Sequence, residues 1–134
     1  IRDRHPDHGK GGSLASHACF ISGLRKLETE IDGVAQEPWR PKFVYHYIQN
    51  EYIEPDLVVD VSDYWEIKKN SILAFKSQFH NPDSKEPESF ISSPEFLDFI
   101  EARSRELGHK INVKYGEGFT VERVAGVKNL FDLI

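Results

Sequence analysis

The densest chemical cluster in this sequence is the segment His5-Pro6-Asp7-His8, close to the first residue. Two imidazoles and a carboxylate so close together could act at one site. Neutral imidazole is a good zinc ligand, and a neighbouring carboxylate can fix its tautomer. Pro6 fixes its own φ and lowers the entropy cost of holding the two rings apart. Short histidine motifs also arise by chance, so spacing alone leaves open a polar loop with incidental histidines.

The composition excludes several other classes of function. The chain has 134 residues, enough for one domain, and a net charge of -5, which argues against broad nucleic-acid binding. No apolar run approaches the length needed to cross a membrane, and the first residues do not read as a signal peptide. The single cysteine, Cys19, excludes an internal disulfide framework and fits a reducing compartment. These features predict a cytoplasmic protein. Asp3 and Asp7 could suggest a glycosidase pair, but acidic loop residues are usually solvated.

The elements that must position the histidines begin with a loop that includes three glycines. Ser13 can cap a helix over about 14–27, and residues 28–41 form a long surface connection. Two strands follow, at 43–48 and at 57–61; the second is a continuous apolar run of the kind found in buried parallel sheets.

The second half of the sequence alternates helix and strand signals. Ser62 can cap a helix over about 63–79, and Ser93-Pro94-Glu95 starts a helix that ends at Gly108. Alternating apolar residues over 111–115 predict a strand, which the glycines at 116–118 should break. The order predicts an α/β fold, part of a layered domain with a mostly parallel sheet. So few strands cannot bury both faces of such a sheet, and we expect residues 1–134 to be the C-terminal fragment of a larger domain.

The segment Arg4-His5-Pro6-Asp7-His8-Gly9 resembles the second motif of the LmbE-like (N-acetylglucosaminyl-phosphatidylinositol de-N-acetylase) superfamily. The likeness covers essentially the whole chain, in order, and is greatest to the bacillithiol-biosynthesis branch, which removes acetyl from N-acetylglucosaminyl malate. Its other segments are Ser22-Gly23-Leu24-Arg25-Lys26, Arg40-Pro41 before the strand 44–48, residues 55–62, Ser77-Gln78-Phe79 and residues 115–119.

The resemblance implies a zinc-dependent deacetylase with a Rossmann-like fold. It implies that His8 is a zinc ligand, that His5 stabilises the oxyanion or protonates the leaving amine, and that Asp7 pairs with His5. It also implies that Arg4 and Arg40 line the pocket for a small sugar conjugate. The general base and two further zinc ligands lie in a family motif that this chain does not contain. Enzymes of this family commonly form homo-oligomers, often hexamers.

One position departs from the family pattern. Phe96 stands where some members have a mobile Tyr near the active site, and a Phe cannot donate a hydrogen bond to an oxyanion. Two alternatives stay open beside the deacetylase. The chain could be a non-catalytic fragment that packs with a partner, or a sugar-binding module that has lost catalysis.

Overall fold

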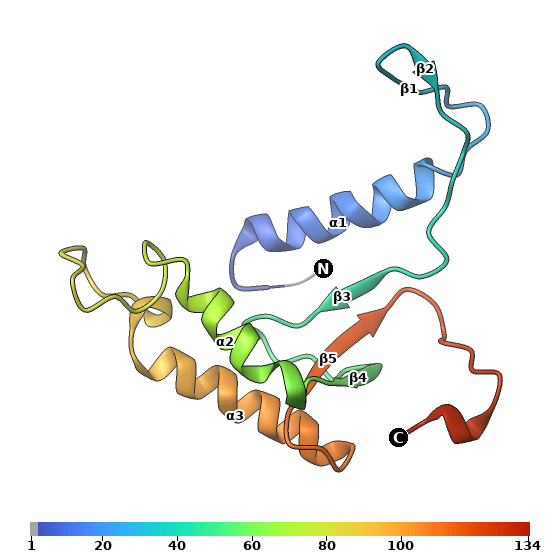
Figure 1. Ribbon diagram of the computed structural model, residues 1–134. Helices are drawn as coiled ribbons and strands as arrows, with labels where there is room; N and C mark the ends of the chain where they lie inside the picture. Colours follow the sequence, from blue (N-terminus) through green and yellow to red (C-terminus); the bar gives the residue numbers. More distant parts are fainter. Residues whose placement is uncertain (1–2) are drawn as a thin grey trace. The chain divides into compact units, whose positions relative to one another are not determined.

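The computed structural model describes residues 3–134, so Ile1 and Arg2 lie outside the described residues (Figure 1). The chain divides into two compact units. The first holds the residues up to Leu57 together with Phe119–Leu133, and the second holds Val58–Gly118 and Ile134. The described chain contains no helix long and apolar enough to span a membrane.

The first unit opens with helix α1, Pro6–Ile21. We expected a helix over about 14–27, and this boundary is wrong. Pro6 occupies the first helical turn, Asp7 places a negative charge there, and the side chain of His5 caps the end. These three features favour a helix start. Together they outweigh the glycines that follow, each of which costs up to about 1 kcal/mol in a helix.

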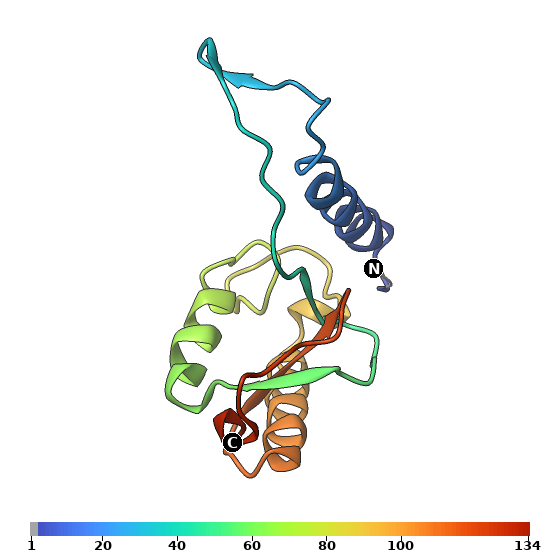
Figure 2. The same ribbon diagram turned by 90° about the vertical axis from the view of Figure 1, so that its right-hand side faces the viewer.

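A short hairpin follows α1 in the segment expected to be a surface connection. Its strands are β1, Glu30–Ile31, and β2, Val34–Ala35. Asp32 and Gly33 form its turn with φ of 51° and 76°. Two successive left-handed residues give the turn type that matches the twist of paired strands. Figures 1 and 2 both show the hairpin extending beyond the C-terminal end of α1.

The expected strands over 43–48 and 57–61 are confirmed as β3, Tyr45–Tyr47, and β4, Leu57–Asp60. Helix α2 covers Trp65–Leu73 and is shorter than expected, whereas the helix after Pro94 is confirmed as α3, Glu95–Lys110. Strand β5 covers Gly116–Val121. Three single-turn 3-10 helices complete the described elements: Ser62–Tyr64, Phe90–Ser92 and Leu130–Asp132.

The three longer strands form a sheet of order β3-β5-β4. In the first unit β3 pairs antiparallel with the second half of β5, with Tyr45 opposite Val121. In the second unit the Val61 amide donates to the Tyr115 carbonyl at 3.0 Å. The hairpin strands also pair antiparallel. The chain is therefore a mixed α/β protein, but the expectation of a mostly parallel sheet is wrong for the strands that the structure describes.

The second unit has an aromatic core. Trp65 and Tyr115 are each 5% exposed, and their rings stack with centroids 4.5 Å apart. Tyr115 precedes β5, which begins at Gly116, where we expected a strand to break. A Cβ at Gly116 would lie 2.7 Å from the backbone nitrogen of Gly108 and 2.9 Å from the carbonyl carbon of Leu107. The glycine is therefore needed for the close approach of α3 to β5.

Gly116→Ala is expected to destabilise the protein by about 1–3 kcal/mol, because an added methyl group must displace backbone atoms rather than a flexible side chain. Gly126→Ala is the matched control, since no described atom outside Gly126 and its two chain neighbours lies within 4 Å of a Cβ built there. Urea unfolding of the two variants measures the difference. Equal unfolding midpoints for Gly116→Ala and Gly126→Ala would contradict this account of the contact.

Candidate active site

The structure brings His5 and His8 together at the first turn of α1. His5 is the N-cap residue and His8 lies one turn into the helix. Their ring centroids are 5.2 Å apart and the ring planes are tilted by 39°. The side chains are 50% and 47% exposed. The two imidazoles predicted from the sequence therefore form an adjacent, solvent-accessible pair.

Asp3 holds the ring of His8. Its Oδ2 lies 2.5 Å from Nδ1 of His8, and its Oδ1 accepts the backbone N–H groups of Asn50 and Glu51 at 3.2 and 3.3 Å. Burial raises the pKa of Asp3, but the hydrogen bond from His8 and the backbone bonds from Arg4, Glu51 and Asn50 together lower it to about 2. Asp3 is thus a carboxylate and can only accept. Nδ1 of His8 must then carry the proton, which leaves Nε2 to face a ligand.

His5 is held in the opposite way. The backbone N–H of Asp7 donates to Nδ1 of His5 at 3.2 Å. An N–H group can donate only to a nitrogen that carries no proton, so a neutral His5 carries its proton on Nε2. The Asp7 carboxylate lies 3.9 Å from the same Nδ1 and its side chain is 76% exposed. The expected pairing of Asp7 with His5 is therefore a contact at ion-pair distance, and the hydrogen bond comes from the Asp7 backbone.

The two predicted arginines lie in different places. Arg4 is exposed and directly precedes His5. Arg40 donates from Nη2 to the Phe20 carbonyl at 2.8 Å, and its guanidinium lies 4.5 Å from the centre of the Phe20 ring. It caps the last turn of α1, a helix about 24 Å long at about 1.5 Å per residue. The structure does not bring Arg40 to the histidine pair, and its role in binding substrate stays a prediction.

The residues between 3 and 134 contain no group of three His, Cys, Asp or Glu side chains that could hold a metal ion. Catalytic zinc needs three protein ligands. The described residues therefore do not form a zinc site by themselves. What they offer is one ring nitrogen, Nε2 of His8, on a histidine whose other nitrogen is bonded to a carboxylate. Such a carboxylate is a common outer partner of metal-binding histidines.

Phe96 departs from the family pattern, and the structure places it among other aromatic rings. Phe96, in the second unit, stacks on Phe79 with centroids 5.5 Å apart and meets Phe90 edge-on. It is thus part of an aromatic cluster.

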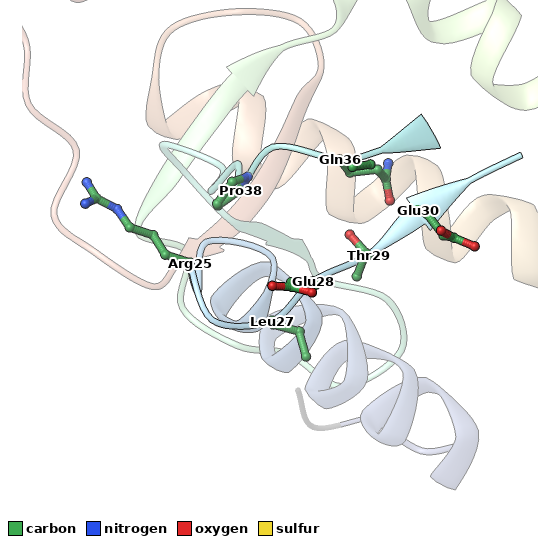
Figure 3. A pocket seen from close by; sticks show the side chains of 8 residues that line it. Arg25, Leu27, Glu28, Thr29, Glu30, Gln36 and Pro38 are labelled. Atoms are coloured by element: carbon green, nitrogen blue, oxygen red, sulfur yellow. The ribbon is translucent and has the colours of Figure 1, made fainter. Parts of the chain in front are cut away.

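A hollow of about 400 Å³ lies beside the hairpin of the first unit, lined by Leu27, Glu28, Gln36 and their neighbours. Figure 3 shows that its lining comes from the chain on both sides of the hairpin. It includes none of the predicted site residues.

No family model matches the chain. Several solved structures do, among them the following two. One is the conserved protein TT1542 from Thermus thermophilus, with 28% identity over 95% of this chain and 51% of that chain, and a TM-score of 0.73. The other is the N,N'-diacetylchitobiose deacetylase from Pyrococcus horikoshii, with 29% identity over 89% of this chain and 40% of that chain, and a TM-score of 0.68.

These two similarities support the resemblance to the LmbE-like superfamily that the sequence motifs indicated. The second of these proteins is named as a deacetylase. The chain spans about half or less of the length of these two structures.

Proposed function

We propose that the segment from Asp3 to His8 is one part of the active site of a zinc-dependent deacetylase. The substrate is an N-acetylglucosamine conjugate, and N-acetylglucosaminyl malate, an intermediate of bacillithiol biosynthesis, is our specific candidate. The observation that carries the proposal is the adjacent pair His5 and His8 at the first turn of α1, with ring centroids 5.2 Å apart. The similarity to a chitobiose deacetylase supports the same reaction class.

The reaction adds water across the amide bond, which gives acetate and a free amino sugar. Negative charge builds on the former carbonyl oxygen as water adds, and the Nε2–H of His5 is a suitable donor to it. A His5 protonated on both nitrogens could also deliver the proton that the leaving amine requires, and its Nδ1–H would then face the Asp7 carboxylate instead of accepting from the Asp7 backbone. His8 offers its unprotonated Nε2 as a metal ligand. Zinc, when bound, lowers the pKa of its bound water towards ~7.

Arg4 is the proposed contact for the conjugate's acidic part. A guanidinium grips a carboxylate with two parallel hydrogen bonds, which suits the two carboxylates of malate. Arg4 is exposed and adjacent in sequence to His5, so it can reach a substrate whose acetyl group lies at the histidine pair. Arg40 remains a second candidate for binding the same substrate, although its contacts here are to Phe20.

The remaining catalytic groups, a general base and two zinc ligands, are proposed to come from a part of the fold that this chain does not match in its structural neighbours. The chain covers only 51% and 40% of those two proteins. We further propose that the complete enzyme is cytoplasmic and forms a homo-oligomer, with a hexamer as one arrangement.

One observation favours the alternative of a non-catalytic fragment that needs a partner. None of the residues of α1 is buried, and Leu14 and Phe20 are 69% and 56% exposed. A helix gains most of its stability from packing an apolar face.

The deciding experiment is an acetate-release assay on the complete protein with N-acetylglucosaminyl malate, diacetylchitobiose and N-acetylglucosamine. We expect activity that a chelator removes and zinc restores. We also expect the 134-residue chain alone to release no acetate, because its described residues contain no set of three metal ligands. Release of acetate by the complete protein that survives chelation would contradict the zinc proposal, and no release from any of the three would contradict the deacetylase.

A further inference from the structure

We propose that Asp3 is a positioning residue for His8, which it holds in the Nδ1–H tautomer with Nε2 presented to a ligand. Asp3 thereby gives His8 the opposite tautomer to that of its neighbour His5. The inference rests on the proposed function only for the identity of that ligand. The state of the ring follows from contacts within the chain.

The first support is that Asp3 is itself fixed. Its side chain is only 8% exposed, whereas that of Asp7, in the same motif, is 76% exposed. One carboxylate oxygen meets His8 and the other accepts from the backbone of Asn50 and Glu51, which follow β3. Asp3 therefore joins the start of α1 to a segment far along the chain. A ring bonded to such an anchor keeps one orientation, which a ring bonded to a mobile loop acid would not.

The second support is the contrast between the two rings. The donor to His5 is a backbone N–H of the helix, so Nδ1 of His5 is an acceptor. The partner of His8 is a carboxylate, so Nδ1 of His8 is a donor. With ring centroids 5.2 Å apart, one imidazole offers a lone pair and the other an N–H. The lone pair on Nε2 of His8 suits a cation, and the N–H on Nε2 of His5 suits an anionic oxygen beside it. In these tautomers neither histidine offers the group that the other one supplies.

Nuclear magnetic resonance of the 134-residue chain, with ¹⁵N-labelled histidine, tests the inference without metal or substrate. At about pH 9, well above the ordinary histidine pKa of ~6.5, the long-range ¹H–¹⁵N spectrum distinguishes protonated from unprotonated ring nitrogens. We expect His8 to have its proton on Nδ1 and His5 on Nε2.

Asp3→Asn should move the ring proton of His8 from Nδ1 to Nε2. The amide oxygen of the new side chain can still accept from Asn50 and Glu51, while its NH₂ group donates to Nδ1. Asp7→Asn is the matched control and should leave the tautomer of His8 unchanged. Asp3→Ala, which removes the acceptor altogether, should give a His8 that no longer holds a single Nδ1–H state.

Two results would overturn the inference: a proton on Nε2 of His8 in the unchanged chain, or an unchanged His8 tautomer in both Asp3 variants. The first is readable even if the variants fail to fold. In the complete enzyme, Asp3→Asn should weaken zinc binding by about 10- to 100-fold, with Asp32→Asn, in the hairpin turn, as the control. A tautomer that follows Asp3 in a protein that binds no zinc would refute the proposed function and leave this inference standing.

Discussion

His8→Ala in the complete enzyme is expected to abolish zinc binding, and deacetylation with it. A catalytic zinc site has three protein ligands and keeps its fourth position for water or substrate. Removing one ligand should therefore cost far more than the ~10- to 100-fold lost with an outer partner. The structure indicates which atom of His8 would bind zinc: Nδ1 is bonded to Asp3, so Nε2 is the nitrogen that stays available.

Metal content after dialysis, together with zinc titration, measures the effect. His17→Ala is the matched control, because His17 is an exposed histidine on the same helix that the proposed site does not use. Unfolding curves of both variants show whether α1 is retained. Full zinc stoichiometry in His8→Ala would remove His8 from the ligand set. Loss of zinc in both variants would show that the helix, rather than the ligand, had been disturbed.

The sequence was sufficient to identify the histidine pair, because its evidence is local. His5 and His8 lie within one turn of chain, and any helix that starts at Pro6 brings their rings close together. The strands β3 and β4 and the start of α3 were predicted for the same reason, since runs of β-branched residues and a Ser-Pro-Glu sequence act through their immediate neighbours.

Asp3 could not be recognised from the sequence. We expected a solvated loop acid, and the structure shows a largely buried carboxylate. Its anchoring partners, the amides of Asn50 and Glu51, are 47 and 48 residues away in sequence. Backbone donors leave no trace in residue type, so no motif could have indicated them. The one local signal is the spacing of Asp3 and His8. That spacing is informative only when the helix is known to start at Pro6, and we expected a later start.

Glycines misled the predictions twice, for opposite reasons. Those following His8 suggested a loop, but the capping of α1 by His5 and the turn at Pro6 determined the conformation. Gly116 suggested a strand end, but it begins β5 because α3 comes so close at Gly108. Neither outcome can be predicted from the glycine alone. The first depends on the helix cap at His5, and the second on the tertiary contact between Gly116 and Gly108. The antiparallel pairing of β5 likewise depends on long-range contacts.

His5→Ala is expected to lower turnover by about 10²- to 10⁴-fold, the usual contribution of a positioned acid–base group, while zinc stays bound. If His5 acts on the developing oxyanion or the leaving amine, its loss should reduce kcat and leave KM nearly unchanged. Steady-state kinetics with the metal content measured in parallel test this directly. Loss of zinc together with activity would instead place His5 in the ligand set.

A structural effect of the same substitution must be separated from the chemical one, because His5 also caps α1 through Nδ1. Losing an N-cap costs about 1 kcal/mol, and a frayed first turn would move His8 as well. His5→Asn separates the two, since the Asn side chain can cap the helix but has no imidazole. We expect His5→Asn to recover the unfolding midpoint of the unchanged enzyme and to remain as slow as His5→Ala. Recovery of turnover in His5→Asn would mean that His5 serves only to start the helix, and that the group facing the oxyanion must be sought elsewhere.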